Sequence, residues 1–176
     1  MHKLRIVVVT QGLSFLPLQL ESEDVVGICE SAPRVWKANL YSQFRRNVRE
    51  ALAHWLGRAT LREHAHGRRA PYFWLHRDNE PEFVKWIKQL QPDLLVVYSM
   101  SQLLSPVALA VPRLGILNIH PSLLPDYRGP NPWFWLYRDG VHQSGVSLHW
   151  LDKGEDTGPI AAQANFDIPL GQSLER

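Results

Sequence analysis

Short runs of β-branched and aromatic residues recur along the chain, separated by segments with helical spacing. The run LRIVVVT at residues 4–10 has no polar alternation, which is typical of a strand buried on both faces of a parallel sheet. Similar runs predict strands at 25–29, 71–75, 94–98, 115–119, 144–151 and 160–168. Because strands alternate with helices, the pattern predicts an α/β fold with a doubly wound, mostly parallel sheet. A short polar loop joins the last two runs, so we expect them to run antiparallel to part of the sheet.

The longest helical pattern covers residues 36–56, where apolar side chains recur every three or four positions. Its arginines fall mainly on the other side of the predicted helix: Arg45, Arg46 and Arg49. Asn79 can cap the next helix and Pro81 suits its first turn, with a buried stripe of Phe83, Trp86, Ile87 and Leu90. Shorter helices are predicted at 14–20, 102–108 and 131–137. The polar, basic stretch 58–69 is interpreted as an exposed connection.

Length and composition fit one globular domain. The chain has 176 residues, of which 45% are hydrophobic and 20% charged, so it can bury a substantial core. We therefore expect a single domain over residues 1–176. The abrupt end soon after the strand at 160–168 suggests that a C-terminal extension is missing.

Charge and hydropathy limit the expected partners. A net charge of +2 and a pI of about 8.8 are lower than those of most nucleic-acid binders, and the arginines between residues 45 and 69 are interpreted as soluble surface. RNA is therefore not expected as a partner. No apolar run reaches the roughly 18 residues of a membrane span and no signal-peptide pattern is seen, so we expect no membrane partner and a cytoplasmic location. The lone Cys29 is expected to be a small buried hydrophobe.

The segment LNIHPSLLPDYRG at residues 117–129 carries the clearest chemistry. Asn118 and His120 are two positions apart, so on a strand both side chains point to the same face, at the carboxyl end where open α/β sheets bind ligands. The loop DKGEDTG adds Asp156, which follows His120 by 36 residues. A carboxylate beside a histidine can orient it, stabilise its charged form and handle protons. Alternatively, Asn118 and His120 only satisfy backbone groups at a strand end.

The pattern N-x-H-P-S-L-L-P-x-Y-R-G, followed by the E-D-T-G-P-I loop, resembles the formyltransferase family. The resemblance is strongest from residue 92 to 168. It implies a Rossmann-like formyltransferase catalytic domain with 10-formyltetrahydrofolate as the formyl donor. It also implies that an acceptor amine attacks the formyl carbon, that Asn118 and protonated His120 stabilise the oxyanion, and that Asp156 holds His120 and helps to take the amine proton.

The resemblance also implies where folate binds. The matching positions lie in two loops: Tyr98, Met100, Leu103 and Leu104 in the first, and Leu151, Gly154 and Glu155 in the second. Apolar Met100, Leu103 and Leu104 would pack on the pterin ring, which suits a mostly apolar cleft. Leu103 and Leu104 can equally be ordinary core residues.

The acceptor is expected to be a small-molecule amine, such as an amino sugar nucleotide. A glycine-rich phosphate loop would indicate a ribonucleotide acceptor, but residues 10–14 contain a single glycine. Three alternatives stay open: a formyltetrahydrofolate deformylase, a methionyl-tRNA formyltransferase-like domain, and an inactive folate-binding module.

Tryptophans and histidines are further candidates for the site. One of Trp133 and Trp135 is expected on the acceptor side, and His149 either faces the site or, as we favour, is a core histidine. His64 and His66 have a possible metal spacing, but no cluster of cysteines or carboxylates completes it. No metal is therefore expected.

Overall fold

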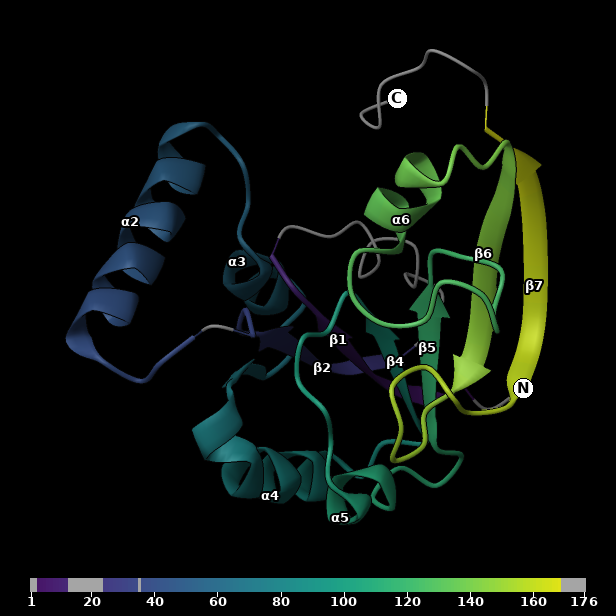
Figure 1. Ribbon diagram of the computed structural model, residues 1–176. Helices are drawn as coiled ribbons and strands as arrows, with labels where there is room; N and C mark the ends of the chain where they lie inside the picture. Colours follow the sequence, from purple (N-terminus) through teal and green to yellow (C-terminus); the bar gives the residue numbers. More distant parts are fainter. Residues whose placement is uncertain (1–2, 13–23, 35, 169–176) are drawn as a thin grey trace.

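The computed structural model describes residues 3–12, 24–34 and 36–168. Seven strands form one sheet in the order β3-β2-β1-β4-β5-β6-β7 (Figure 1). They are β1 (Arg5–Thr10), β2 (Asp24–Ser31), β3 (Tyr72–Leu75), β4 (Leu94–Tyr98), β5 (Ile116–His120), β6 (Gln143–Trp150) and β7 (Ile160–Asp167). The first five run parallel, and β6 pairs antiparallel with both β5 and β7. The doubly wound, mostly parallel sheet is thus confirmed, as is the antiparallel pairing near its end.

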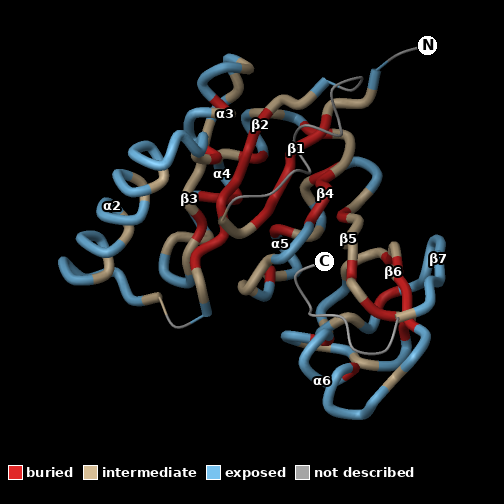
Figure 2. Tube along the Cα trace, turned by 90° about the horizontal axis from the view of Figure 1, so that it is seen from above, coloured by how far each residue is buried: buried red, intermediate tan, exposed pale blue. Residues whose placement is uncertain are grey.

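The centre of the sheet is covered on both faces. Along β1, Val7 and Val9 belong to one buried cluster, whereas Ile6 and Val8 belong to another. Helices α4 (Glu80–Leu90) and α5 (Pro106–Leu109) contribute to the first cluster, and α3 (Leu61–Gly67) packs on Ile28 of β2. Figure 2 shows the buried residues concentrated along these central strands. The continuous apolar run of β1 is therefore explained by burial on two sides.

The other predicted helices form with small shifts in their limits. A 3-10 turn, η1 (Arg77–Asn79), leads into α4, and α6 (Pro132–Arg138) follows β5. The helix predicted at 102–108 begins only at Pro106, because Ser105 caps it by accepting from the amide of Ala108. The helix predicted at 14–20 lies outside the described residues.

The sequence predicted an exposed connection at 58–69. This prediction is wrong, because the stretch contains α3. Its first turn has a reciprocal capping box: the Thr60 hydroxyl accepts from the Glu63 amide, and the Glu63 carboxylate accepts from the Thr60 amide. Leu61 and Ala65 of this helix are buried against the sheet. The stretch is polar and basic overall, but two apolar residues on one face make it a short amphipathic helix.

Helix α2 (Leu40–Trp55) also differs from the prediction. It begins after Asn39, which caps it by accepting from the Ser42 amide, so Trp36 precedes the helix. Its apolar face is exposed, whereas Arg46 and Arg49, on the other side, turn toward the sheet. Figure 2 shows α2 almost entirely exposed along the rim of the molecule. Across the part of the chain that is described, none of the helices has the length and apolarity needed to cross a membrane.

Candidate active site

A cleft of about 660 Å³ opens at the carboxyl ends of β4 and β5. Asn118 and His120 both lie on β5, His120 as its last residue. All ten residues proposed from the sequence line the cleft: Tyr98, Met100, Leu103, Leu104, Asn118, His120, Leu151, Gly154, Glu155 and Asp156. The two loops and the strand tip predicted to meet are therefore brought together around one cavity.

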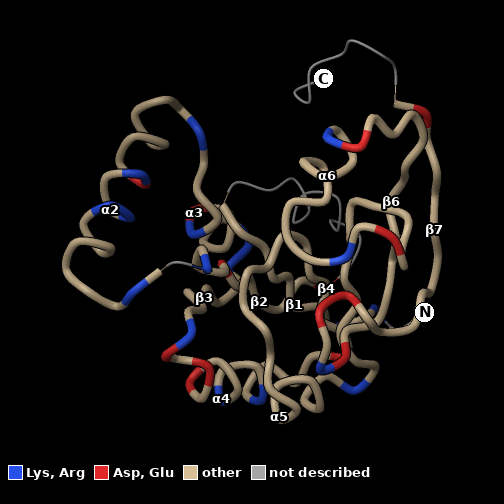
Figure 3. The backbone as a smooth tube through the Cα atoms, in the orientation of Figure 1, with Lys and Arg blue, Asp and Glu red and all other residues tan. Residues whose placement is uncertain are grey.

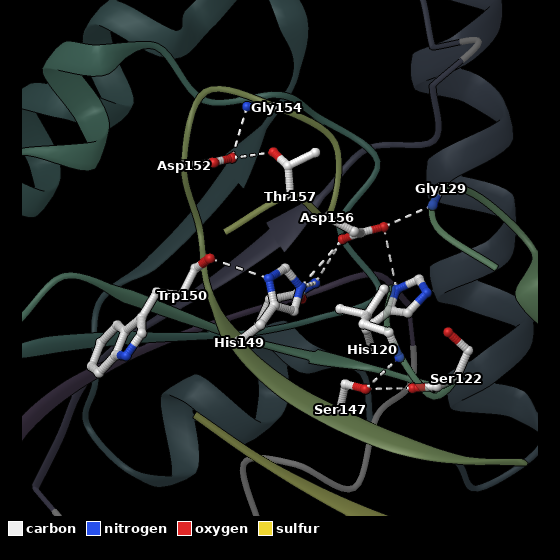
Figure 4. A network of polar contacts seen from close by, with 12 residues as sticks. His120, Ser122, Gly129, Ser147, His149, Trp150, Asp152, Gly154, Asp156 and Thr157 are labelled. Carbon is white, nitrogen blue, oxygen red and sulfur yellow. Dashed lines mark hydrogen bonds and ion pairs between the residues drawn. The ribbon is translucent and has the colours of Figure 1, made fainter. Parts of the chain in front are cut away.

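Asp156 lies between two histidine rings (Figure 4). Its Oδ2 is 3.3 Å from Nδ1 of His120, and its Oδ1 is 3.3 Å from Nε2 of His149. The backbone amide of Gly129 donates to Oδ2 at 2.9 Å, and the side-chain amide of Asn118 donates to Oδ1 at 3.2 Å. The carboxylate thus organises groups from β5, β6 and the loop after β5.

Burial acts to raise the pKa of Asp156. Hydrogen bonds from His149 and from the Gly129 amide, together with the positive charges of His120 and His149, outweigh it and lower that pKa below its ordinary value. The contributions from the histidines apply to their protonated forms. The geometry therefore favours an ionised carboxylate at the centre of the site.

Both ring nitrogens of His120 face acceptors. Nε2 lies 2.9 Å from the carbonyl oxygen of Tyr127, which can only accept, and Nδ1 faces the Asp156 carboxylate. Both acceptors are satisfied together only when the ring carries two protons. The ring is 5% exposed, so in this arrangement its donors are used within the protein.

His149 was favoured as a core histidine, and it is fully buried. It nevertheless contacts two site residues. Its Nδ1 lies 3.1 Å from the carbonyl of Trp150, so this nitrogen carries a proton. In the neutral ring Nε2 then carries no proton and accepts from the Asn118 amide at 3.0 Å. In the charged ring Nε2 carries a proton and donates to Asp156. His149 is therefore both core and part of the polar group.

The loop after β5 is fastened to β6 through Ser147. This buried hydroxyl donates to the carbonyl of Ser122 at 2.6 Å and accepts from the amide of Leu124 at 2.9 Å. Gln163 of β7 donates to the Ser147 oxygen and to the Leu124 carbonyl, each at 2.8 Å. Side chains of β6 and β7 thus hold in place the loop that supplies the Tyr127 carbonyl and the Gly129 amide.

The loop between β6 and β7 is folded around Asp152. The Thr157 hydroxyl and the Gly154 amide donate to its Oδ1 at 2.7 and 2.8 Å and lower its pKa. Asp156 has φ +51°, a left-handed conformation that aspartate tolerates better than most residues. The loop therefore aims Asp156 into the cleft without needing glycine at that position.

The folate positions predicted from the sequence differ in exposure. Leu104 is buried at the floor of the cleft, whereas Leu103 is 63% exposed. Met100 and Leu151 pack partly buried against the main core cluster. Of the two tryptophans weighed for the acceptor side, Trp133 lines the cleft. Leu104, Met100 and Leu151 thus give the cleft an apolar wall that suits a flat heterocycle.

Two half-exposed residues that line the cleft, Arg34 and Glu155, form an ion pair. Nη2 of Arg34, just after β2, lies 2.7 Å from Oε1 of Glu155. Figure 3 shows acidic residues gathered in the β6–β7 loop. Arg34 is the single Lys or Arg among the described residues lining the cleft, beside three carboxylates: Asp152, Glu155 and Asp156.

No group of three or more His, Cys, Asp or Glu side chains within the described ranges is arranged to hold a metal ion. His64 and His66 lie in the last turn of α3. Glu63, their closest carboxylate in sequence, is engaged with Thr60 and His54.

Comparison with known proteins identifies the family. The profile described as "Formyl transferase" matches residues 50–176, more than half of the chain. The chain belongs to the formyl transferase family. The resemblance seen in the N-x-H and E-D-T-G-P-I segments is thereby confirmed.

Relatives in sequence include methionyl-tRNA formyltransferases. The chain is 48% identical to that of Chloroflexus aggregans over 90 residues, which are 51% of this chain and 29% of that protein. It is 34% identical to that of Clostridioides difficile over 113 residues, 64% of this chain and 37% of that protein. This formyl transferase family member thus spans about a third of the length of these curated relatives.

Solved structures share the fold. Glycinamide ribonucleotide transformylase 1 from Geobacillus kaustophilus matches with a TM-score of 0.71 at 26% identity, over 98% of this chain and 87% of that one. A formyltetrahydrofolate deformylase from Pseudomonas syringae matches with a TM-score of 0.69 at 19% identity, over 98% of this chain and 54% of that one. The Rossmann-like formyltransferase fold expected from the resemblance is confirmed.

Proposed function

We propose that this chain is a catalytic domain that transfers a formyl group from 10-formyltetrahydrofolate to an amine. The observation that carries the proposal is the contact of Asp156 with both Asn118 and His120 inside the cleft. Family membership supports the donor. The apolar wall of Met100, Leu104 and Leu151 supports a bound pterin, and the cleft volume of about 660 Å³ lies within the range of small-molecule sites.

In the proposed reaction a bond forms between the acceptor nitrogen and the formyl carbon, and the bond from that carbon to the folate nitrogen breaks. Asn118 and His120 stabilise the oxyanion that develops between these steps, a contribution worth about a hundredfold or more in rate for each donor. Asp156 receives the proton lost by the amine, directly or through water, and passes it to the folate nitrogen as the bond from that nitrogen to the formyl carbon breaks. Tetrahydrofolate and the formamide are the products.

The contacts within the site indicate how the donors are released. When His149 is neutral, each N–H of the Asn118 amide has an acceptor, Nε2 of His149 at 3.0 Å and Asp156 at 3.2 Å. We infer that this longer contact, and the 3.3 Å contact between Nδ1 of His120 and Asp156, are exchanged for the oxyanion when substrates bind. Hydrogen bonds of catalytic groups are often arranged differently before substrate binding.

We propose a small-molecule amine as acceptor, such as the sugar end of an amino sugar nucleotide. Three carboxylates line the cleft, and its cation Arg34 is already paired with Glu155. A phosphate placed within the cleft would meet this negative charge, so phosphates of the acceptor would have to lie outside it. Methionyl-tRNA is the second candidate, favoured by the 48% identity to the Chloroflexus aggregans protein over 90 residues. We further propose the cytoplasm as the compartment, in keeping with the single, buried and free Cys29.

The test is an acceptor panel with 10-formyltetrahydrofolate as donor. An amino sugar nucleotide, methionyl-tRNA, glycinamide ribonucleotide and no acceptor are compared by following tetrahydrofolate release and the mass of each acceptor. Formylation of the amino sugar supports the proposal, and formylation of methionyl-tRNA supports the second candidate. If tetrahydrofolate is released at the same rate with and without an acceptor, the chain is a deformylase. Donor binding without turnover in any arm indicates an inactive folate-binding module and contradicts the proposal.

A further inference from the structure

Helix α2 lies at the outer edge of the molecule and is exposed along nearly its whole length (Figures 1 and 2). The helix contains no buried residue. Seven side chains of the helix and its C-cap are exposed, by 84% at Leu40 and 79% at Trp55: Leu40, Tyr41, Phe44, Val48, Leu52, Trp55 and Leu56. Monomeric proteins rarely leave a contiguous apolar patch of more than a few hundred Å² uncovered. This face is therefore typical of an interface.

The inward contacts of α2 fix which face points outward. Nη2 of Arg49 lies 2.6 Å from Oε1 of Glu30, a β2 carboxylate that is only 6% exposed. The guanidinium of Arg46 lies 4.9 Å from the ring centre of Trp74 in β3. Rotating α2 to bury its apolar face would leave Glu30 without its arginine, which is costly for a buried charge. The apolar face therefore stays outward.

The exposed apolar face is symmetric about Val48. At 100° per residue its members spread over about 160° of the helix circumference, with Val48 at the middle. Three apolar pairs lie at equal sequence distances on either side of Val48: Leu40 and Leu56, Tyr41 and Trp55, and Phe44 and Leu52. In an antiparallel pairing of two copies of α2 with Val48 on the two-fold axis, Val48 meets Val48, and Tyr41 and Phe44 lie level with Trp55 and Leu52 of the second copy, while Leu40 and Leu56 cover the edges of the interface.

Area and charge are compatible with such a pairing. An aromatic side chain alone presents roughly 150–250 Å², and the seven side chains together expose on the order of 900 Å², close to the ~800 Å² that each partner buries in a stable complex. The seven residues of the face itself carry no charge, so the pairing buries no charged side chain at its centre.

We propose that the exposed apolar face of α2 binds a second copy of this chain, forming an antiparallel helix pair about a two-fold axis at Val48. Because Val48 would meet itself, a charge at this position tests the register directly. Sedimentation equilibrium of the whole chain should show a dimer between about 1 and 100 µM, where weaker interfaces of this size associate. Val48→Glu and Val48→Lys should each raise the dimer dissociation constant at least 100-fold. An equimolar mixture of the two variants should restore association, because opposite charges then face each other.

Two controls make the result specific. Val107→Glu, at a residue of α5 that is 59% exposed, should leave dimerisation unchanged. Under oxidation Val48→Cys should cross-link to itself, whereas Tyr41→Cys should cross-link only when mixed with Trp55→Cys; the native Cys29 is buried. Circular dichroism checks that each variant is folded. A wild-type monomer at the highest concentration, a dimer unaffected by Val48→Glu, or charge variants that do not associate when mixed would overturn the proposal.

Discussion

Nε2 of His149 lies 3.3 Å from Oδ1 of Asp156, on the side of the carboxylate opposite His120. His149 is the cross-strand neighbour of Asn118 in the β5–β6 pairing. The same nitrogen is 3.0 Å from the Asn118 amide. His149 can therefore set the orientation of both Asn118 and Asp156 without reaching the cleft, where it is not a lining residue.

Replacing His149 should impair turnover more than binding. We expect His149→Leu to lower kcat by about 10- to 100-fold, because small displacements of catalytic groups cost rates of this order, while the KM for the folate donor changes little. His149→Gln, which keeps a polar group, should recover part of the loss. Steady-state kinetics over a range of pH provide the measurement, with the exposed His142→Gln as control. A loss confined to KM, or equal in both His149 variants, would argue against a positioning role.

The Arg34–Glu155 ion pair should influence substrate binding and not the chemical step. Both partners are about half exposed, so their pairing adds little to stability, but they line the cleft. We expect Arg34→Gln to change the KM of donor or acceptor about tenfold with kcat nearly unchanged. Arg113→Gln removes a similar ion pair, with Asp93 at 2.8 Å, outside the cleft and should alter neither constant. A change in kcat alone would contradict this assignment.

Stability should depend on pH through Asp156. Its pKa in the folded chain lies below the ordinary value of 3.8. The ionised carboxylate therefore stabilises the fold above that pH, and this contribution is lost as the pH falls through the folded pKa. We expect the difference in unfolding free energy between wild type and Asp156→Asn to shrink between pH 5 and about pH 3. Urea unfolding at both pH values measures it, and a difference that is the same at both would contradict the shift.

Close packing at Gly145 predicts a stability effect remote from the chemistry. A Cβ added there would overlap the Ala164 carbonyl oxygen and would lie 2.6 Å from Cδ2 of Leu123. Gly145→Ala should therefore lower the unfolding free energy by about 1–3 kcal/mol. Gly67→Ala is the matched control, because a Cβ at Gly67 meets nothing within 4 Å. Equal unfolding midpoints for the two variants would show that β6 and β7 can separate at no cost.

Much of the fold could be predicted because its central strands are apolar on both faces. Such runs are typical of a parallel sheet whose two faces are both covered. The meeting of Asn118, His120 and Asp156 was also predictable, since it depends on strand alternation and on a common sheet edge. His149 could not be assigned, because its position opposite Asn118 depends on the antiparallel register of β6, which local sequence does not specify.

Two predictions about helices were wrong, for different reasons. For α3, the Thr60–Glu63 capping box was present in the sequence but was outweighed by the surrounding basic residues. For α2, the periodicity was interpreted correctly as helical, but periodicity does not say which face turns inward. The buried Glu30, which pairs with Arg49, and the Trp74 ring, which attracts Arg46, decide it. These partners come from other strands and are not visible in the helix itself.

The most direct test of the proposed function is single-turnover formyl transfer by wild type and Asp156→Asn. Asparagine has the same shape and tolerates the left-handed backbone at φ +51°, so the fold should persist while the proton acceptor is lost. Asp139→Asn, an exposed carboxylate outside the cleft, is the control. We predict a rate at least about a hundredfold lower for Asp156→Asn and an unchanged rate for Asp139→Asn. A folded Asp156→Asn variant that transfers formyl groups at the wild-type rate would contradict the central claim.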